Sequence, residues 1–206
     1  MNGAEGIVRT LIASGVDHCF PNPGTSEMYF VQALDRIEGL RCVLCLFENV
    51  ATGAADGYGR MADRPASTLL HLGPGLANGW SNLHNAARAQ APVVNLIGEH
   101  ATYHREFETP LKSDIEGLAS RVPSWVRCSE DVAAVCRDTA EAVRIANSPP
   151  GRIATQIVSL DVSWSDGAEV APPLPAAAPQ SVAQAAVREA AELIRAEEPT
   201  LLLLTG

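Results

Sequence analysis

The residues best suited to proton transfer follow short apolar segments of the chain. Glu48 comes directly after the run Val43–Phe47, and His71 lies at the end of a second run. A third apolar segment leads into the sequence PNPGT, residues 21–25. Carboxylate and imidazole groups are common acids and bases in enzymes. If the three segments are neighbouring strands, these residues meet at one edge of a sheet and form a pocket.

Each candidate also has a purely structural explanation. A glutamate at the start of a helix interacts favourably with the helix dipole, by about 0.3–1 kcal/mol. His71 is also explained as a core residue with satisfied ring nitrogens, and Thr25 as a threonine that caps a turn. The residue types alone therefore leave the chemistry open, and the elements that position them must be considered.

Apolar periodicity predicts an alternation of strands and helices. Helices are predicted over residues 3–14, 26–38 (with Ser26 as N-cap), from about Glu48, over 76–89 and, after a cap at residues 129–131, through Ile145. Strands are predicted over 16–20, 43–47, 67–72, 93–97, 122–128 and 152–159. This order predicts an α/β fold, a parallel doubly wound sheet with helices on both faces. In such a sheet, ligands bind beyond the carboxyl ends of the strands, where the candidate residues fall.

The last fifth of the chain has a different composition. Residues 166–180 are rich in proline and alanine, which predicts a linker. Residues 181–206 predict a helix followed by a buried parallel strand that has no partner in this chain. The expected organisation is one domain over residues 1–165, a linker over 166–180, and the truncated start of a second α/β domain over 181–206.

Composition argues against several classes of protein. Of the 206 residues, 47% are hydrophobic and 19% charged, and the net charge is −9. An acidic surface does not neutralise nucleic-acid phosphates. No apolar run reaches the ~18 residues of a membrane-spanning helix, and the first residues do not resemble a signal peptide, so a cytoplasmic location is expected. Cys42 and Cys45 lie three apart on a predicted strand and face opposite sides, which argues against a redox or metal site.

The sequence ENVATGAADGYGRMADRPA, residues 48–66, resembles the E-x-x-A-x-x-A-A-x-G-Y-A-R segment of thiamine-diphosphate (ThDP) enzymes. This family includes acetolactate synthase and benzoylformate decarboxylase. Three further segments match in the same order: residues 15–24, the G-P-G-x-x-N of residues 73–78, and Ala-Pro-Val at 91–93. The resemblance covers about residues 1–165. It implies the pyrimidine-binding domain of an enzyme that decarboxylates or ligates small 2-oxo acids.

By this resemblance, Glu48 hydrogen-bonds the cofactor's aminopyrimidine and so promotes removal of the proton at C2 of the thiazolium, the step that forms the reactive ylid. Asn22, Pro23 and Gly24 are expected to shape the loop beside the cofactor ring. Asn78 either lines the same pocket or caps its helix.

Two further residues match benzoylformate decarboxylase-like members of the family. His71 corresponds to a histidine that relays protons to and from the reacting carbonyl. Thr25 corresponds to a hydroxyl residue that binds the substrate carboxylate. Acetolactate synthases differ in the segment A-F-Q-E-T-P, because Phe107 stands here at their glutamine position. That difference argues against acetolactate synthesis in the strict sense.

The resemblance also sets expectations for cofactors and partners. The family binds the diphosphate and Mg²⁺ through a G-D-G motif and a later asparagine in another domain; this chain lacks that motif, so no metal-ligating residue is expected in it. FAD occurs in some members, where the middle domain binds it, and the sequence does not decide its presence. A homodimer or a dimer of dimers is implied.

Two alternatives remain open from the sequence. The chain could be the pyrimidine-binding subunit of a split two-chain decarboxylase of the sulfopyruvate or phosphonopyruvate type, or a non-catalytic binding module of the same fold. A metal site at His100 and His104 is not favoured, because the segment around them has no helical pattern. A polar loop near the mouth of the pocket is expected there instead.

Overall fold

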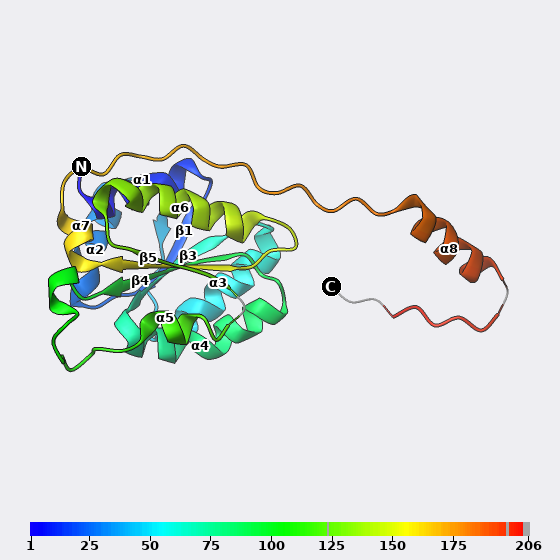
Figure 1. The fold of residues 1–206 in the computed structure, drawn as a ribbon, viewed down its shortest axis with the longest axis horizontal. Helices are drawn as coiled ribbons and strands as arrows, with labels where there is room; N and C mark the ends of the chain where they lie inside the picture. Colours follow the sequence, from blue (N-terminus) through cyan, green and yellow to red (C-terminus); the bar gives the residue numbers. More distant parts are fainter. Residues whose placement is uncertain (123, 197, 204–206) are drawn as a thin grey trace.

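The computed structural model describes residues 1–122, 124–196 and 198–203. Its sheet contains six parallel strands in the order β2-β1-β3-β4-β6-β5 (Figure 1). The strands are β1 (His18–Asn22), β2 (Arg41–Cys42), β3 (Ala66–His71), β4 (Val93–Glu99), β5 (Ser124–Ser129) and β6 (Ile153–Ser159). The helices are α1 (Gly3–Ala13), α2 (Met28–Arg36), α3 (Glu48–Ala62), α4 (Leu72–Arg88), α5 (Ile115–Ala119), α6 (Val132–Asn147), α7 (Leu160–Trp164) and α8 (Gln184–Arg195). The predicted parallel α/β fold is confirmed.

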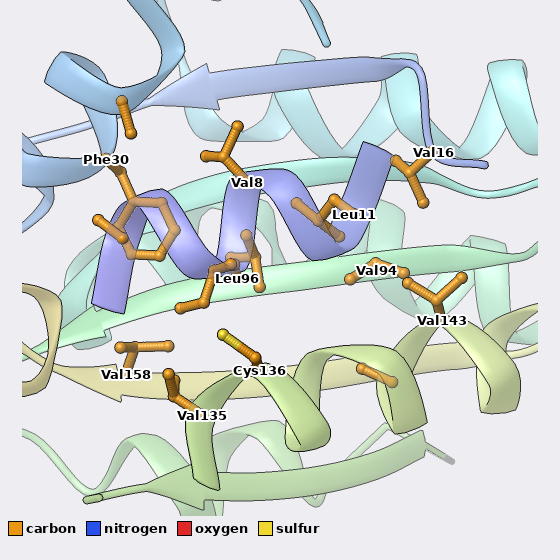
Figure 2. Close-up of a cluster of buried hydrophobic side chains, with 14 of the residues drawn as sticks. Val8, Leu11, Val16, Phe30, Val94, Leu96, Val135, Cys136, Val143 and Val158 are labelled. Atoms are coloured by element: carbon orange, nitrogen blue, oxygen red, sulfur yellow. The ribbon is translucent and has the colours of Figure 1, made fainter. Parts of the chain in front are cut away.

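Helices cover both faces of the sheet (Figure 1). Residues of α1, α2, α6 and α7 form one buried cluster with one face, and residues of α3, α4 and α5 form a second cluster with the other. Figure 2 shows the first cluster, which joins Val8 and Leu11 of α1 with Leu96 of β4 and Cys136 of α6. Removing such apolar surface from water is the main term that stabilises the layers.

The second helix differs from its prediction because a buried carboxylate intervenes. A 3₁₀ turn, η1 (Thr25–Glu27), precedes α2, and Ser26 is buried in that turn rather than capping a helix. The Gly24 N–H donates to the Glu27 carboxylate at 2.7 Å. The predicted start at Ser26 is therefore wrong, and the helix begins two residues later. The segment 129–131 does cap α6, since the Asp131 side chain accepts from Ala133 N at 3.0 Å.

The strand predicted over residues 43–47 is wrong, because β2 ends at Cys42. Val43 N still donates to Cys19 O at 2.9 Å, and Cys45 N donates to Pro21 O at 3.0 Å. Pro21 has no backbone N–H to donate to the chain beside it, so the hydrogen-bonded pairing of β1 and β2 ends there. β1 itself runs two residues later than predicted and includes Pro21 and Asn22.

The Cys42–Cys45 pair lies where this ladder breaks. Cys42 is exposed and Cys45 is buried, and both are free thiols. Loss of water contact around the sulfur raises the pKa of both thiols, only partly at Cys42, where the neighbouring Cys45 adds to the effect. Neither side chain is therefore activated as a thiolate nucleophile.

The segment after β6 begins on the domain and then leaves it. Asp166 forms an antiparallel bridge with Asn2, and Ala168 and Ala171 are buried in the first cluster. Helix α8 buries none of its residues and lies apart from the layers (Figure 1). The sequence predicted a strand near the C-terminus, but residues 198–203 of that segment form no regular element. Residues 197 and 204–206 of the same segment lie outside the described part. Within the described ranges, no helix is both long and apolar enough to span a membrane.

Helices α3 and α4 pack closely because small residues line their contact. The Thr52 hydroxyl donates to Gly79 O at 3.0 Å. A Cβ added at Gly79 would lie 2.8 Å from Thr52 Cγ2 and 3.4 Å from Glu48 O. Glu48 begins α3, so this contact also sets the position of its side chain.

We predict that Gly79→Ala lowers the free energy of unfolding by about 1–3 kcal/mol, because the methyl group forces the two helices apart. Gly57→Ala is the matched control on α3, where a Cβ meets no atom within 4 Å. That control should raise the free energy by up to about 1 kcal/mol through helix propensity. Urea denaturation of both variants tests this, and equal effects would contradict close packing at Gly79.

Candidate functional site

Glu48 opens α3 at the carboxyl edge of the sheet and is half-buried, as expected. Its Oε2 accepts a hydrogen bond from Asn78 Nδ2 at 3.1 Å. Asn78 lies within α4, whose N-cap is His71, so it does not cap that helix. A Cβ added at Gly75 would lie 3.4 Å from Glu48 Oε1 and 3.5 Å from His71 Cβ. The start of α4 therefore passes directly between the two candidate acid–base residues.

His71 is the last residue of β3, and the chain turns into α4 immediately after it. Leu72 makes this turn with φ +53°, a left-handed conformation that is uncommon for a residue with a side chain. Such strain persists where the surrounding structure enforces it, and Leu72 is fully buried. The helix thus starts four residues before its predicted beginning at Leu76, and the G-P-G segment forms its first turn.

Glu27 is a functional candidate that the sequence analysis missed. Its side chain is fully buried, and Oε2 hydrogen-bonds His71 Nδ1 at 2.8 Å as well as Gly24 N. Its other oxygen, Oε1, is buried without a hydrogen-bond partner in the described part of the chain. The available signal was a glutamate three residues after Gly24, the spacing at which a carboxylate reaches back to the backbone of a turn.

Glu27 raises the pKa of His71. The hydrogen bond is the largest cause; burial of the ring opposes it, and the negative charges of Glu27 and Glu48 add to it. Two carboxylates from different elements therefore act on one imidazole. This arrangement favours a protonated histidine, which can donate a proton to a neighbouring group.

The loop after β1 closes over the same site. A Cβ added at Gly24 would overlap the His71 ring, so only glycine allows this approach. The Asn22 side chain donates to Cys45 O at 2.7 Å and holds the segment before Glu48, and Pro23 is half-buried beside it.

Thr25 lies at the rim of this loop. It is exposed and begins the 3₁₀ turn, whose N-cap is Gly24, so it is not the cap of that turn. Its contact with a substrate remains a prediction.

Hollows lie at both edges of the sheet. One of about 470 Å³ lies at the amino edge, where α3, α4 and α6 end, and no predicted site residue lines it. A smaller one of about 120 Å³ lies beyond β4 and is lined by His100 and His104, among others. Among the residues that the structure describes, no group of three or more His, Cys, Asp or Glu side chains is placed to hold a metal ion.

Comparison with known proteins identifies the family. Residues 1–119 match the family described as "Thiamine pyrophosphate enzyme, N-terminal TPP binding domain". The whole chain is 52% identical to 39% of the Mycobacterium tuberculosis protein named "Putative acetolactate synthase large subunit IlvX". It is 30% identical to 34% of acetolactate synthase large subunit IlvB1 from another strain of that organism. Over 66% of its length it is 30% identical to 24% of the acetolactate synthase isozyme 3 large subunit of Escherichia coli.

The chain therefore spans well under half the length of these curated relatives. The matched residues 1–119 contain every element that builds the site: η1, α3, β3, the first turns of α4, and the end of β4. The chain belongs to the thiamine pyrophosphate enzyme family and carries its N-terminal TPP-binding domain.

Proposed function

We propose that this chain supplies the pyrimidine half of the active site of a ThDP-dependent enzyme that decarboxylates or ligates small 2-oxo acids. The observation that carries the proposal is the position of Glu48. It begins α3 beside Asn78 and Gly75, and its charge acts on His71 at the same edge. A glutamate that only stabilises the start of a helix does not require a histidine and an asparagine side chain beside its carboxylate.

The residues at this edge fit the aminopyrimidine of the cofactor. Glu48 presents a carboxyl group for a ring nitrogen, and Gly75 leaves space beside Oε1. Leu46 and Phe47, which precede Glu48, are 92% and 46% exposed and offer apolar surface to a flat ring. When bound, ThDP supplies a carbon nucleophile that adds to a carbonyl group. The diphosphate and Mg²⁺ are assigned to residues outside this site.

Within this proposal, Glu48 holds a proton at the aminopyrimidine nitrogen, and Asn78 orients its carboxyl group from α4. His71 is the acid that delivers a proton to the reacting carbonyl, and Glu27 positions its ring. Thr25, exposed directly after the Pro23–Gly24 loop, is assigned to the substrate carboxylate. Glu48, His71 and Asn78 lie on α3, β3 and α4, and such regular elements hold catalytic groups more accurately than loops do.

The apolar surface beside Glu48 supports a site that a second protein surface completes. Leu44, Leu46 and Val50 are 65%, 92% and 56% exposed, and they surround the start of α3. Contiguous exposed apolar residues next to a polar site mark interaction surfaces. We assign this surface to another domain or subunit in an oligomeric enzyme, so the chain alone should turn over no substrate.

Glu48→Gln should abolish the reaction, because an amide cannot exchange a proton with the aminopyrimidine. The measurement is ThDP- and Mg²⁺-dependent CO₂ release by the full product of the gene, across a panel of 2-oxo acids. We expect at least ~10²-fold lower turnover, the lower bound for loss of a positioned proton transfer. The exposed Glu38→Gln is the control and should leave the rate unchanged. Nearly intact release by Glu48→Gln would refute the role.

Glu27→Gln should return the pKa of His71 toward the ordinary histidine value, since the variant keeps the shape of the side chain but loses its charge. A raised pKa stabilises the fold below the unfolded value of about 6.5, and this stabilisation is lost as pH rises through the folded-state pKa. The wild-type advantage over Glu27→Gln in unfolding free energy should therefore be largest in acid. NMR titration of the His71 ring measures the shift directly. An unchanged midpoint would contradict the pairing.

A further inference from the structure

The small pocket beyond β4 has a composition that the site at Glu48 does not explain. Its volume is about 120 Å³, below the ~300–1,000 Å³ of ordinary small-molecule sites. It therefore has room for a small ion or one functional group of a substrate. Its lining combines side chains from the end of β4 and the loop that follows: Glu99, His100, His104, Arg105, Phe107, Thr109, Lys112 and Ser113.

A chain of hydrogen bonds fixes one wall of this pocket. The Glu99 carboxylate accepts from His100 N at 2.7 Å and meets His100 Nδ1 at 3.1 Å. On the other side of the ring, His100 Nε2 lies 3.1 Å from the Thr109 hydroxyl. Glu99 and His100 side chains are only 14% and 19% exposed. The imidazole is thus held in one orientation, as in sites where a carboxylate sets the ring of a functional histidine.

Two cations, Arg105 and Lys112, also line the pocket and differ in how firmly they are held. Arg105 is bound by Glu130 and by the Ser159 hydroxyl. Lys112 pairs with Glu108 at 3.7 Å, and the Glu108 side chain is 88% exposed. Exposed ion pairs of this kind contribute little, about 0–1 kcal/mol, so Lys112 can turn to a ligand at small cost. It is the one lysine of the chain.

This pocket adjoins the candidate active site. In the sheet register, His71 of β3 lies opposite Gly98 of β4, one residue before Glu99. A Cβ added at Gly98 would overlap the Glu27 carboxylate that holds His71. Ser113 packs so closely on Gly73 that a Cβ there would overlap it. The loop that forms the pocket therefore rests on the first turn of α4, next to His71.

We propose that this pocket binds the carboxylate of a monocarboxylic acid other than the one assigned to Thr25, with Lys112 as the cation that contacts it and the His100 ring, held by Glu99 and Thr109, as a fixed wall. Glu99 lines the same pocket, which disfavours a doubly charged phosphate. Phe107 is 56% exposed at the pocket and provides an apolar wall for a short carbon chain. The assignment of this acid as a 2-oxo acid rests on the proposed function; the carboxylate site itself does not.

The single lysine allows a direct test on the 206-residue chain. Isotope-labelled lysine gives one side-chain resonance, which is followed by NMR while pyruvate is added without ThDP. We expect a saturable shift with pyruvate, and no saturable shift with acetone, its uncharged analogue. Loss of the carboxylate contact in Lys112→Met should raise the Kd measured from backbone amides of the loop by about tenfold. Lys112→Arg keeps the charge and should retain most of the affinity.

Any of four results would overturn the proposal. The first three are a lysine resonance that pyruvate leaves unmoved, an equal response to acetone, and a Kd that Lys112→Met leaves unchanged. The fourth is phosphate bound more tightly than pyruvate. Because the titration omits ThDP, its failure leaves the role of Glu48 untouched. Conversely, pyruvate binding here would survive even if Glu48→Gln retained full CO₂ release and the proposed function fell.

Discussion

The structure of the site depends on one buried carboxylate, that of Glu27. It joins the loop after β1 to the end of β3 through Gly24 N and His71 Nδ1, and it packs against Gly98 at the end of β4. A buried charge is costly unless other groups compensate it. Gly24, His71 and Gly98 therefore have little freedom to change. Glu27 thus adds hydrogen bonds between the loop after β1 and the end of β3 to the apolar packing that holds the layers together.

The helices add the second constraint, through their close contact. Thr52 bonds Gly79 across α3 and α4, which leaves Glu48 facing Asn78. The left-handed Leu72 lets α4 start directly after His71. The two residues proposed for acid–base chemistry, Glu48 and His71, thus come from different elements that are fixed closely relative to each other. Such fixed placement is what proton transfer at a bound cofactor requires.

Sequence patterns were sufficient to predict the elements with a regular apolar period, and the edge of the sheet where the candidate functional residues lie. The alternation of strands and helices predicted the parallel sheet, and Glu48 and His71 do lie together at its carboxyl edge. The patterns failed where a local interaction overrides periodicity. Pro21 cannot donate to β2, so an apolar run that looks like a strand leaves the sheet.

Two further differences have the same kind of cause. The carboxylate of Glu27 takes the N–H of Gly24, so the first turn after that loop is 3₁₀ rather than α-helical. Leu72 accepts a left-handed conformation that no residue preference predicts. Glu27 was missed because the residues next to it in the sequence do not indicate that it is buried. Its role depends on His71, which is 44 residues away in the chain. Contacts of this range are set by topology and are visible only in the folded chain.

The central claim is that Glu48 activates the cofactor, and exchange of the cofactor's C2 proton tests it most directly. The measurement compares deuterium exchange at C2 of ThDP bound to the full gene product with exchange in its Glu48→Gln variant, at matched cofactor occupancy. The account predicts fast exchange in the wild type and a rate near that of free ThDP in the variant. Equal rates in the two proteins would contradict it, because the carboxyl group would then have no part in activating the cofactor.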